Sequence, residues 1–263
     1  MYDDPILRPS TLPATLDLAL ASYNIHRCFG TDGRYLPERT AEVIEALDAD
    51  IIGLQEVDMR LLVDGRAQLD FLAESLDMAA VPGPNVKGRR GKFGNALLSR
   101  WPVRSVRRVD LTVRHYEPRG ALDCRIDIAG TRTRVVVTHL GLNAAERDIQ
   151  INRLMAALEE DEDHLPTVVM GDFNEWKPTR GALRHVDRRF GRSLMHRTFP
   201  SRLPLLPLDR IWVWPAEGMK HLAAYATPLS RITSDHLPLR ARVSWNVGGH
   251  PSAPGPDFSI TNV

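Results

Sequence analysis

The chain has 263 residues, of which 43% are hydrophobic and 25% charged, as in a globular protein with a sizeable core. Its 34 basic and 33 acidic residues give a formal net charge of +1, which argues against bulk, sequence-independent binding of nucleic acid. Two cysteines, Cys28 and Cys124, make no disulfide framework and favour a reducing, cytoplasmic location. We expect neither a signal peptide nor a transmembrane segment, because no suitable apolar run is present.

Strands and helices are predicted to mix along the chain. In chain order we expect a strand at 16–26, a helix at 36–50, a strand at 51–57, a helix at 67–76, strands at 95–103, 121–129 and 133–141, a helix at 144–161, and strands at 167–174, 208–215, 221–227 and 236–245. The helix at 144–161 is predicted to bury Ile149, Leu154, Ala157 and Leu158 on one face. No linker interrupts this pattern, which indicates a single α/β domain over 15–245, preceded by an N-terminal arm at 1–14 and followed by a flexible tail at 246–263.

Most of the predicted strands have polar or ionisable residues of a few kinds at their ends. They are Asn24, His26, Glu56, His139, Asp172, Asn174, Asp209, Asp235 and His236. One such residue alone is more often a turn or structural residue, so only the set as a whole indicates a site. Carboxylate and amide oxygens suit Mg²⁺ or Mn²⁺, and no Cys/His cluster has the spacing of a zinc site. Acids, amides and imidazoles together fit metal-assisted displacement at phosphorus.

The stretch "PTVVMGDFNEW" (166–176) is the most informative of these strand ends. Asp172 and Asn174 are two residues apart, so both side chains would face the same side if the strand continues through them. Phe173 would then point the other way, into the packing. Gly171 removes side-chain bulk where the backbone and a substrate could approach each other.

Taken in order, "YNIH", "LQEVD", "GNALLSR", "THLG", "GDFNEW", "LDRIWV" and "SDHLPL" resemble the motifs of the endonuclease/exonuclease/phosphatase superfamily, the DNase I-like metal-dependent phosphohydrolases. The motifs span residues 23 to 240, and the pattern is most similar to compact bacterial members. The resemblance implies an α/β four-layer sandwich, in which two stacked mixed β-sheets are flanked by helices. It places the active site at one end of the sheets.

The resemblance also implies roles for individual residues. Glu56, Asn24 and Asp235 would hold Mg²⁺ or Mn²⁺, and Asp172 would orient or deprotonate the attacking water. Asn174 would hold a phosphate oxygen or a metal-bound water. His236, oriented by Asp209, would be the general base or contact phosphate, and His139 would stabilise transition-state charge or protonate the leaving oxygen. The residues expected to bind substrate are His26, Asn95, Arg119 and Trp176.

The substrate class remains open at this point. His26 and the "TH" of "THLG" are closer to the branches of pancreatic-type DNases, sphingomyelinases and inositol-phosphate phosphatases than to abasic-site endonucleases. Residues 87–108 hold eight Lys or Arg and no acid, which suits a nucleic-acid backbone or peripheral contact with an anionic membrane, or else a water-facing strand flank. We therefore predict a monomeric phosphoesterase acting on nucleic acid or on a lipid or small-molecule phosphoester. A non-catalytic binding protein of the same fold is disfavoured because no main motif residue is lost.

Overall fold

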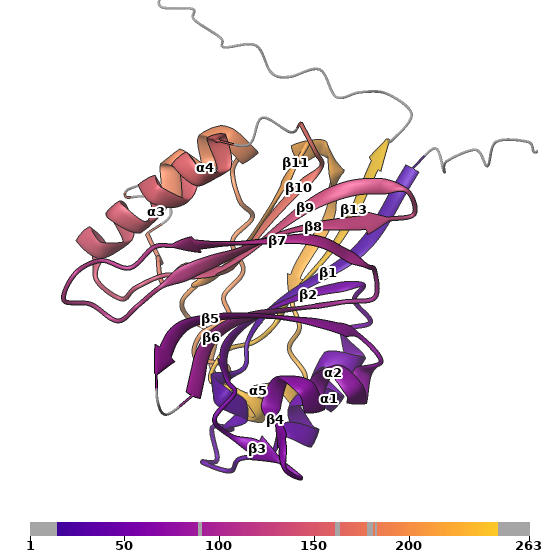
Figure 1. Ribbon diagram of the computed structural model, residues 1–263, viewed down its shortest axis with the longest axis vertical. Coiled ribbons are helices and arrows are strands. Elements are labelled where there is room, and N and C mark those ends of the chain that lie inside the picture. The colour runs from indigo at the N-terminus through magenta and orange to yellow at the C-terminus, as the bar shows by residue number, and fades with distance from the viewer. Residues whose placement is uncertain (1–14, 89–90, 161–163, 178–180, 182, 247–263) are drawn as a thin grey trace, which may run out of the picture.

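The computed structural model of the protein describes residues 15–88, 91–160, 164–177, 181 and 183–246. The predicted N-terminal arm and the predicted tail beyond Asn246 lie outside these residues. Two large β-sheets are stacked on each other, with helices on their outer faces (Figure 1). The first sheet has the strand order β12 (Met219–Ala224), β13 (Leu239–Asn246), β1 (Thr15–Asn24), β2 (Ile51–Asp58), β6 (Gly91–Ser99) and β5 (Ala79–Gly88).

The second sheet has five strands. Its order is β11 (Asp209–Trp214), β10 (Thr167–Asp172), β9 (Thr131–His139), β8 (Gly120–Ile128) and β7 (Val103–Asp110). A small separate hairpin is formed by β3 (Leu62–Val63) and β4 (Arg66–Ala67). The helices are α1 (Pro37–Ala46), α2 (Gln68–Leu76) and α5 (Ser230–Thr233) on the side of the first sheet, and α3 (Ala144–Glu159) and α4 (Leu183–Phe190) on the side of the second (Figure 1).

Each sheet contains one parallel pair of strands among antiparallel neighbours. In the first sheet β1 and β2 are parallel, and Asn24 lies opposite Gln55 at their carboxyl ends. In the second sheet β9 and β10 are parallel, and His139 lies opposite Asp172. A parallel connection requires a crossover, and α1 and α3 lie within the two crossovers. Both parallel pairs therefore carry polar residues at the carboxyl ends of their strands.

Three apolar layers hold these elements together. The central layer lies between the two sheets, and includes Leu20, Leu97, Val137 and Met170. The two outer layers lie between each sheet and its helices, with Ile44 and Leu72 in one and Leu154, Phe173 and Val186 in the other. Burial of these side chains is the main favourable contribution to folding. The four-layer sandwich predicted from the sequence is confirmed.

Two local predictions were wrong, and one strand was missed. The predicted strand at 95–103 is divided: β6 ends at Ser99, whose hydroxyl bonds to the backbone of Trp101, and β7 begins at Val103 after Pro102. The edge strand β5 was missed because Pro82 and Pro84 interrupt its pattern, although proline is tolerated at a sheet edge. Ile149 is 42% exposed rather than buried, because the buried face of α3 is set by Ile151, Leu154, Met155 and Leu158.

The helix α4 was also missed. Its sequence, Leu183–Phe190, is mostly polar, and only Leu183, Val186 and Phe190 are buried. Helix α3 ends at Glu159, close to the predicted end. No helix within the described part of the chain is long and apolar enough to cross a membrane.

Candidate active site

Four of the predicted site residues end the two parallel strand pairs. Asn24 ends β1, Glu56 lies near the end of β2, His139 ends β9 and Asp172 ends β10. The amide nitrogen of Asn24 donates to Glu56 Oε1 at 3.0 Å and to Asp172 Oδ2 at 3.1 Å. One side chain of the first sheet thus joins a carboxylate of each sheet, and the site is a product of the stacking of the two sheets.

Glu56 lies at an irregularity of β2. The register with β6 shifts between Leu54 and Val57, and Glu56 has a φ of 58°, in the left-handed region that a glutamate rarely adopts. Such a conformation costs about 1–3 kcal/mol and is found most often at functional sites. The bulge directs the Glu56 carboxylate toward Asn24. Burial raises the pKa of Glu56, while the hydrogen bond from Asn24 opposes the shift.

Asp172 and Asn174 come together by a turn, which corrects the expectation of a continuing strand. β10 ends at Asp172, and Asn174 has a φ of 50°. The backbone N–H of Asn174 donates to Asp172 Oδ1 at 2.9 Å, the local bond that aspartate commonly makes in turns. Phe173 is fully buried against Trp212, as predicted. Gly171 is required, because a Cβ there would lie 1.9 Å from the carbonyl oxygen of Thr138.

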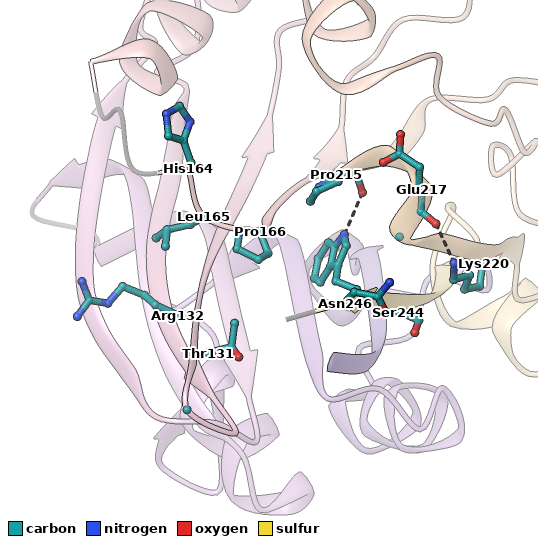
Figure 2. Close-up of a pocket in the computed structure, with 13 residues that line it drawn as sticks. Thr131, Arg132, His164, Leu165, Pro166, Pro215, Glu217, Lys220, Ser244 and Asn246 are labelled. Atoms are coloured by element: carbon teal, nitrogen blue, oxygen red, sulfur yellow. Dashed lines mark hydrogen bonds between the residues drawn. The ribbon is translucent and has the colours of Figure 1, made fainter. Parts of the chain in front are cut away.

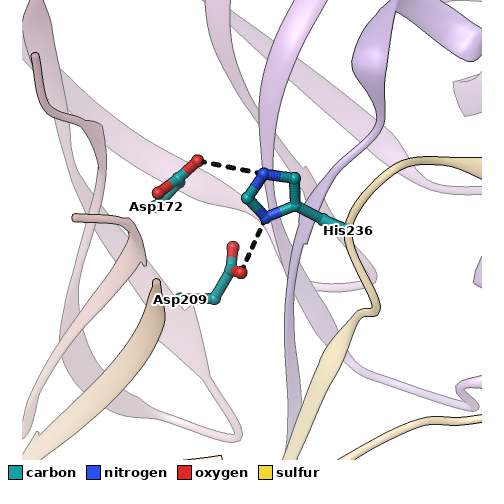
Figure 3. Close-up of side chains that lie close together, drawn as sticks. All are labelled: Asp172, Asp209 and His236. Carbon is teal, nitrogen blue, oxygen red and sulfur yellow. Dashed lines mark hydrogen bonds and ion pairs between the residues drawn. The ribbon is translucent and has the colours of Figure 1, made fainter. Parts of the chain in front are cut away.

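His236 lies between two carboxylates, as Figure 3 shows. Its Nδ1 is 2.9 Å from Asp209 Oδ2, and its Nε2 is 3.6 Å from Asp172 Oδ2. Burial by itself would lower the pKa of His236, but the two carboxylates raise it to about 10. The ring is therefore an imidazolium at neutral pH and a hydrogen-bond donor at both nitrogens.

His139 is in the opposite electrostatic state. Burial lowers the pKa of His139 to about 3, so the ring is neutral at pH 7. Arg119 Nη1 lies 3.3 Å from its Nδ1. Its Nε2 lies 3.6 Å from Asp172 Oδ2 and 3.2 Å from the amide nitrogen of Asn174. The donor groups of Arg119 and Asn174 thus face the two ring nitrogens. Asp172 is thus flanked by one charged and one neutral imidazole.

The other predicted residues have more local contacts. His26 Nδ1 lies 3.1 Å from the carbonyl oxygen of Phe29 and 3.9 Å from Asp235 Oδ1. Trp176 is 47% exposed and lies two residues beyond Asn174. Asn95 is buried on β6, and its amide donates to the carbonyl of Gly120, the residue after Arg119. The Oδ1 atom of Asn95 is buried with no hydrogen-bond partner among the described residues.

Two hydroxyl residues that support the site were not predicted. Thr198 Oγ1 donates to Asp209 Oδ2 at 2.5 Å. Ser234 Oγ donates to the carbonyl of Asn24 at 2.7 Å and accepts from the backbone N–H of His236. Ser234 precedes two predicted residues in "SDH", so its position was a usable signal. Thr198 lies in a connection without regular structure, and its sequence neighbours carry no such signal.

The residues present fit a divalent cation in two places. Asn24, Glu56 and the nearby Asp235 offer hard oxygen atoms around a buried carboxylate whose pKa is raised by burial. Asp172, Asp209 and His236 offer ligand atoms within 4.8 Å of one another. In the second group the imidazolium itself lies between the carboxylates and balances their charge. The first group therefore fits a cation better than the second group does.

A separate cavity of about 570 Å³ lies at the other end of the sandwich (Figure 2). It is lined by Thr131 at the start of β9, by Pro166 before β10 and by Trp245 near the end of β13, among others. None of the residues predicted for the site lines it. Cavity volume and the convergence of polar strand ends therefore point to opposite ends of this fold.

The two stacked mixed sheets, with helices outside and an acid, amide and imidazole cluster at one end, define a DNase I-like α/β sandwich. The family model described as Endonuclease/Exonuclease/phosphatase family matches residues 21–236, and the chain belongs to this family. Membership indicates a phosphoesterase in general.

Three proteins illustrate this relationship. Protein YbhP of Escherichia coli strain K12 is 35% identical over 241 residues, which cover 84% of this chain and 93% of YbhP. An endonuclease/exonuclease/phosphatase family protein from Bacteroides thetaiotaomicron has a TM-score of 0.74 at 17% identity, covering 91% of this chain and 99% of its own. The mannosyl-6-phosphatase of Bacteroides thetaiotaomicron VPI-5482 has a TM-score of 0.70 at 18% identity, covering 86% and 99%. At such identities the two structures show likeness of fold.

Proposed function

We propose that the protein is a Mg²⁺- or Mn²⁺-dependent hydrolase of phosphoester bonds, in which activated water attacks phosphorus in line with the leaving oxygen. The observation that supports this most is the position of Asp172. Its Oδ2 accepts from Asn24 and lies 3.6 Å from a nitrogen of His139 and of His236. A carboxylate fixed in position by these contacts is suited to orient the attacking water molecule, and we assign it as the acceptor of the water proton.

In this proposal Asn24 and Glu56, with Asp235, hold the cation. When bound, it would neutralise phosphate charge and position the ester. His236, as an imidazolium paired with Asp209, donates to a phosphate oxygen rather than serving as the general base. His139 and Asn174 face the same centre and stabilise charge that develops on the oxygens. Arg119, whose guanidinium lies against His139, adds a fixed positive charge suited to a phosphate oxygen.

The basic segment at 87–108 bears on the choice of substrate. Among its described side chains, Arg104 pairs with Asp127 at 3.0 Å and Arg107 with Asp123 at 3.1 Å. Arg108 donates to the carbonyl of Pro82 at 2.7 Å. These guanidinium groups already have partners, so they favour the interpretation of a strand flank over that of a nucleic-acid surface. We propose a small-molecule or lipid phosphoester as substrate, with a nucleic-acid phosphodiester as the competing class.

An assay against a panel of substrates tests both the proposed enzymatic function and the proposed substrate class. The purified chain would be incubated with Mg²⁺ or Mn²⁺ and with a chromogenic phosphodiester, a sugar phosphate, a sphingomyelin-type lipid, plasmid DNA and RNA. The sugar phosphate is included because one structural neighbour is named as a mannosyl-6-phosphatase. We expect metal-dependent turnover of a small or lipid phosphoester. Turnover of DNA or RNA alone would overturn the substrate class, and no turnover of any phosphoester would overturn the enzymatic function.

We also propose that residues 15–245 form one catalytic domain. Asn24 from β1 and His236, just before β13, contribute to the same cluster and are joined through Ser234. A boundary between them would divide the site.

A further inference from the structure

Two loops carry the second sheet's contribution to the site. The loop at 140–143 follows His139 and leads into α3, and the loop at 173–177 follows Asp172 and carries Asn174. The two loops touch directly where the Asn174 amide donates to the carbonyl of Leu140 at 2.9 Å. The distance from Asn174 to His139 depends on how firmly these loops are held together.

Arg147, on the first turn of α3, connects both loops. Its Nη1 donates to the carbonyls of Leu142 at 2.7 Å and Gly141 at 3.3 Å. Its Nη2 donates at 2.9 Å to Oε2 of Glu175, the residue that follows Asn174. The guanidinium also lies 5.8 Å from the ring centre of Trp176. Arg147 is 3% exposed and Glu175 is 4% exposed, so solvent screens this pair very little.

The neighbouring contacts fix the same loops independently. The backbone N–H of Gly141 donates to Gln150 Oε1 at 2.8 Å, and Gln150 Nε2 donates to Glu146. A Cβ at position 141 would lie 2.0 Å from the Glu146 carboxylate, so a larger residue there would displace this side chain. On the other loop, Arg210 Nη2 donates to the carbonyl of Glu175 at 3.3 Å. The first two turns of α3 therefore hold the loop that follows His139, and Arg147 on the same helix also holds the loop that carries Asn174.

We infer that the buried pair Arg147–Glu175 is a positioning pair that sets the separation of His139 and Asn174 in the reaction. Neither residue reaches the reacting atoms, and both act through the loops that carry those side chains. This inference rests on the proposed function. Its physical basis is that a misplacement of about 1 Å can lower a rate by about 100-fold, even when its cause lies away from the chemistry.

The chain offers a matched control in Arg134. This residue is also a buried arginine, on β9, and it donates to Asp123 and to the carbonyl of Leu158 near the other end of α3. Arg134→Lys and Arg147→Lys each remove a forked guanidinium while keeping the charge. Both variants should lose stability, but only Arg147 contacts the two loops that carry site residues.

The experiment compares Arg147→Lys and Glu175→Gln with Arg134→Lys at a temperature where thermal melts show all three folded. We expect kcat to fall about 10- to 100-fold in the first two variants, the range seen when supporting partners of site residues are changed. KM should change much less, because the ground-state contacts remain. The double variant should lose no more than the stronger single variant, because the two residues act as one unit. Arg134→Lys should keep wild-type kcat.

A second measurement does not depend on turnover. Amide hydrogen exchange at Gly141 and Asn174 should become at least about 10-fold faster in Arg147→Lys and Glu175→Gln, and stay unchanged in Arg134→Lys. Exchange and kcat that are unchanged in the first two variants would overturn the positioning role. If the wild type turns over no phosphoester, the proposed function fails, and the exchange result still decides whether this pair holds the loops.

Discussion

The two sheets present different side chains through the same arrangement of strands. Each has one parallel strand pair whose carboxyl ends meet. In the proposed mechanism the first sheet delivers Asn24 and Glu56 as oxygen ligands for a cation, whereas the second delivers His139 and Asp172 to handle protons and phosphate charge. Stacking the two sheets would thus bring a metal half and a proton half together, and a hydrogen bond from Asn24 to Asp172 joins them.

The second sheet is tested most strongly at Asp172. We expect Asp172→Asn to lower kcat by about 10²- to 10⁴-fold, the usual contribution of a positioned general base. The amide keeps the shape but cannot accept the proton from water. Steady-state kinetics with Mn²⁺ measure the loss, and a thermal melt checks folding. Asp127→Asn, which removes the half-buried partner of Arg104 on β8, is the control and should be neutral. Wild-type turnover by a folded Asp172→Asn variant would contradict the role.

The first sheet is tested at Glu56. A cation at about 100 times its Kd should stabilise the wild type by about 2.7 kcal/mol, because it binds the folded chain alone. Glu56→Gln should lose most of this stabilisation and most metal-dependent activity. Thermal melts with and without Mn²⁺ measure it. Glu74→Gln, at an exposed position on α2 that pairs with Arg66, should keep the full shift. An equal shift in Glu56→Gln would place the cation elsewhere.

The smallest effect on activity is expected away from both halves, at Asp123 on β8. This buried carboxylate accepts from Arg134 at 2.8 Å and from Arg125 at 2.6 Å. Burial raises its pKa, but the guanidinium partners outweigh this and hold the pKa below the ordinary value. Asp123→Asn should leave kcat unchanged while it costs about 3–5 kcal/mol of unfolding free energy at pH 7.

The same variant has a defined pH dependence. Because the folded pKa of Asp123 lies below the unfolded value of about 3.9, its stabilisation is complete above that pH and is lost as the pH falls through the folded pKa. Urea unfolding of wild type and Asp123→Asn at pH 7 and at successively lower pH values measures this. The difference in unfolding free energy should narrow only below about pH 4. A constant difference would show that the lost contacts are not electrostatic.

Much of the fold could be predicted from local pattern. Alternation, short apolar runs and helical periodicity located β1, β2, β9, β10 and α3, because these elements bury apolar side chains in regular patterns. The pattern failed at β5, where Pro82 and Pro84 lie on an edge strand, and at α4, where few residues are buried. Elements at the periphery of the fold have a weak hydrophobic pattern because little of their surface is buried.

The sequence by itself also determined which residue types stand at the strand ends, and their order sufficed to predict a metal-assisted phosphoesterase. Only the tertiary structure decided their electrostatic states. His139 and His236 carry the same imidazole, yet burial lowers the pKa of the first to about 3 while two carboxylates raise the pKa of the second to about 10. Those carboxylates, Asp172 and Asp209, come from β10 and β11, and Arg147 meets Glu175 across 28 positions of chain. Such pairings arise between residues distant in sequence, so only the packed fold could establish them.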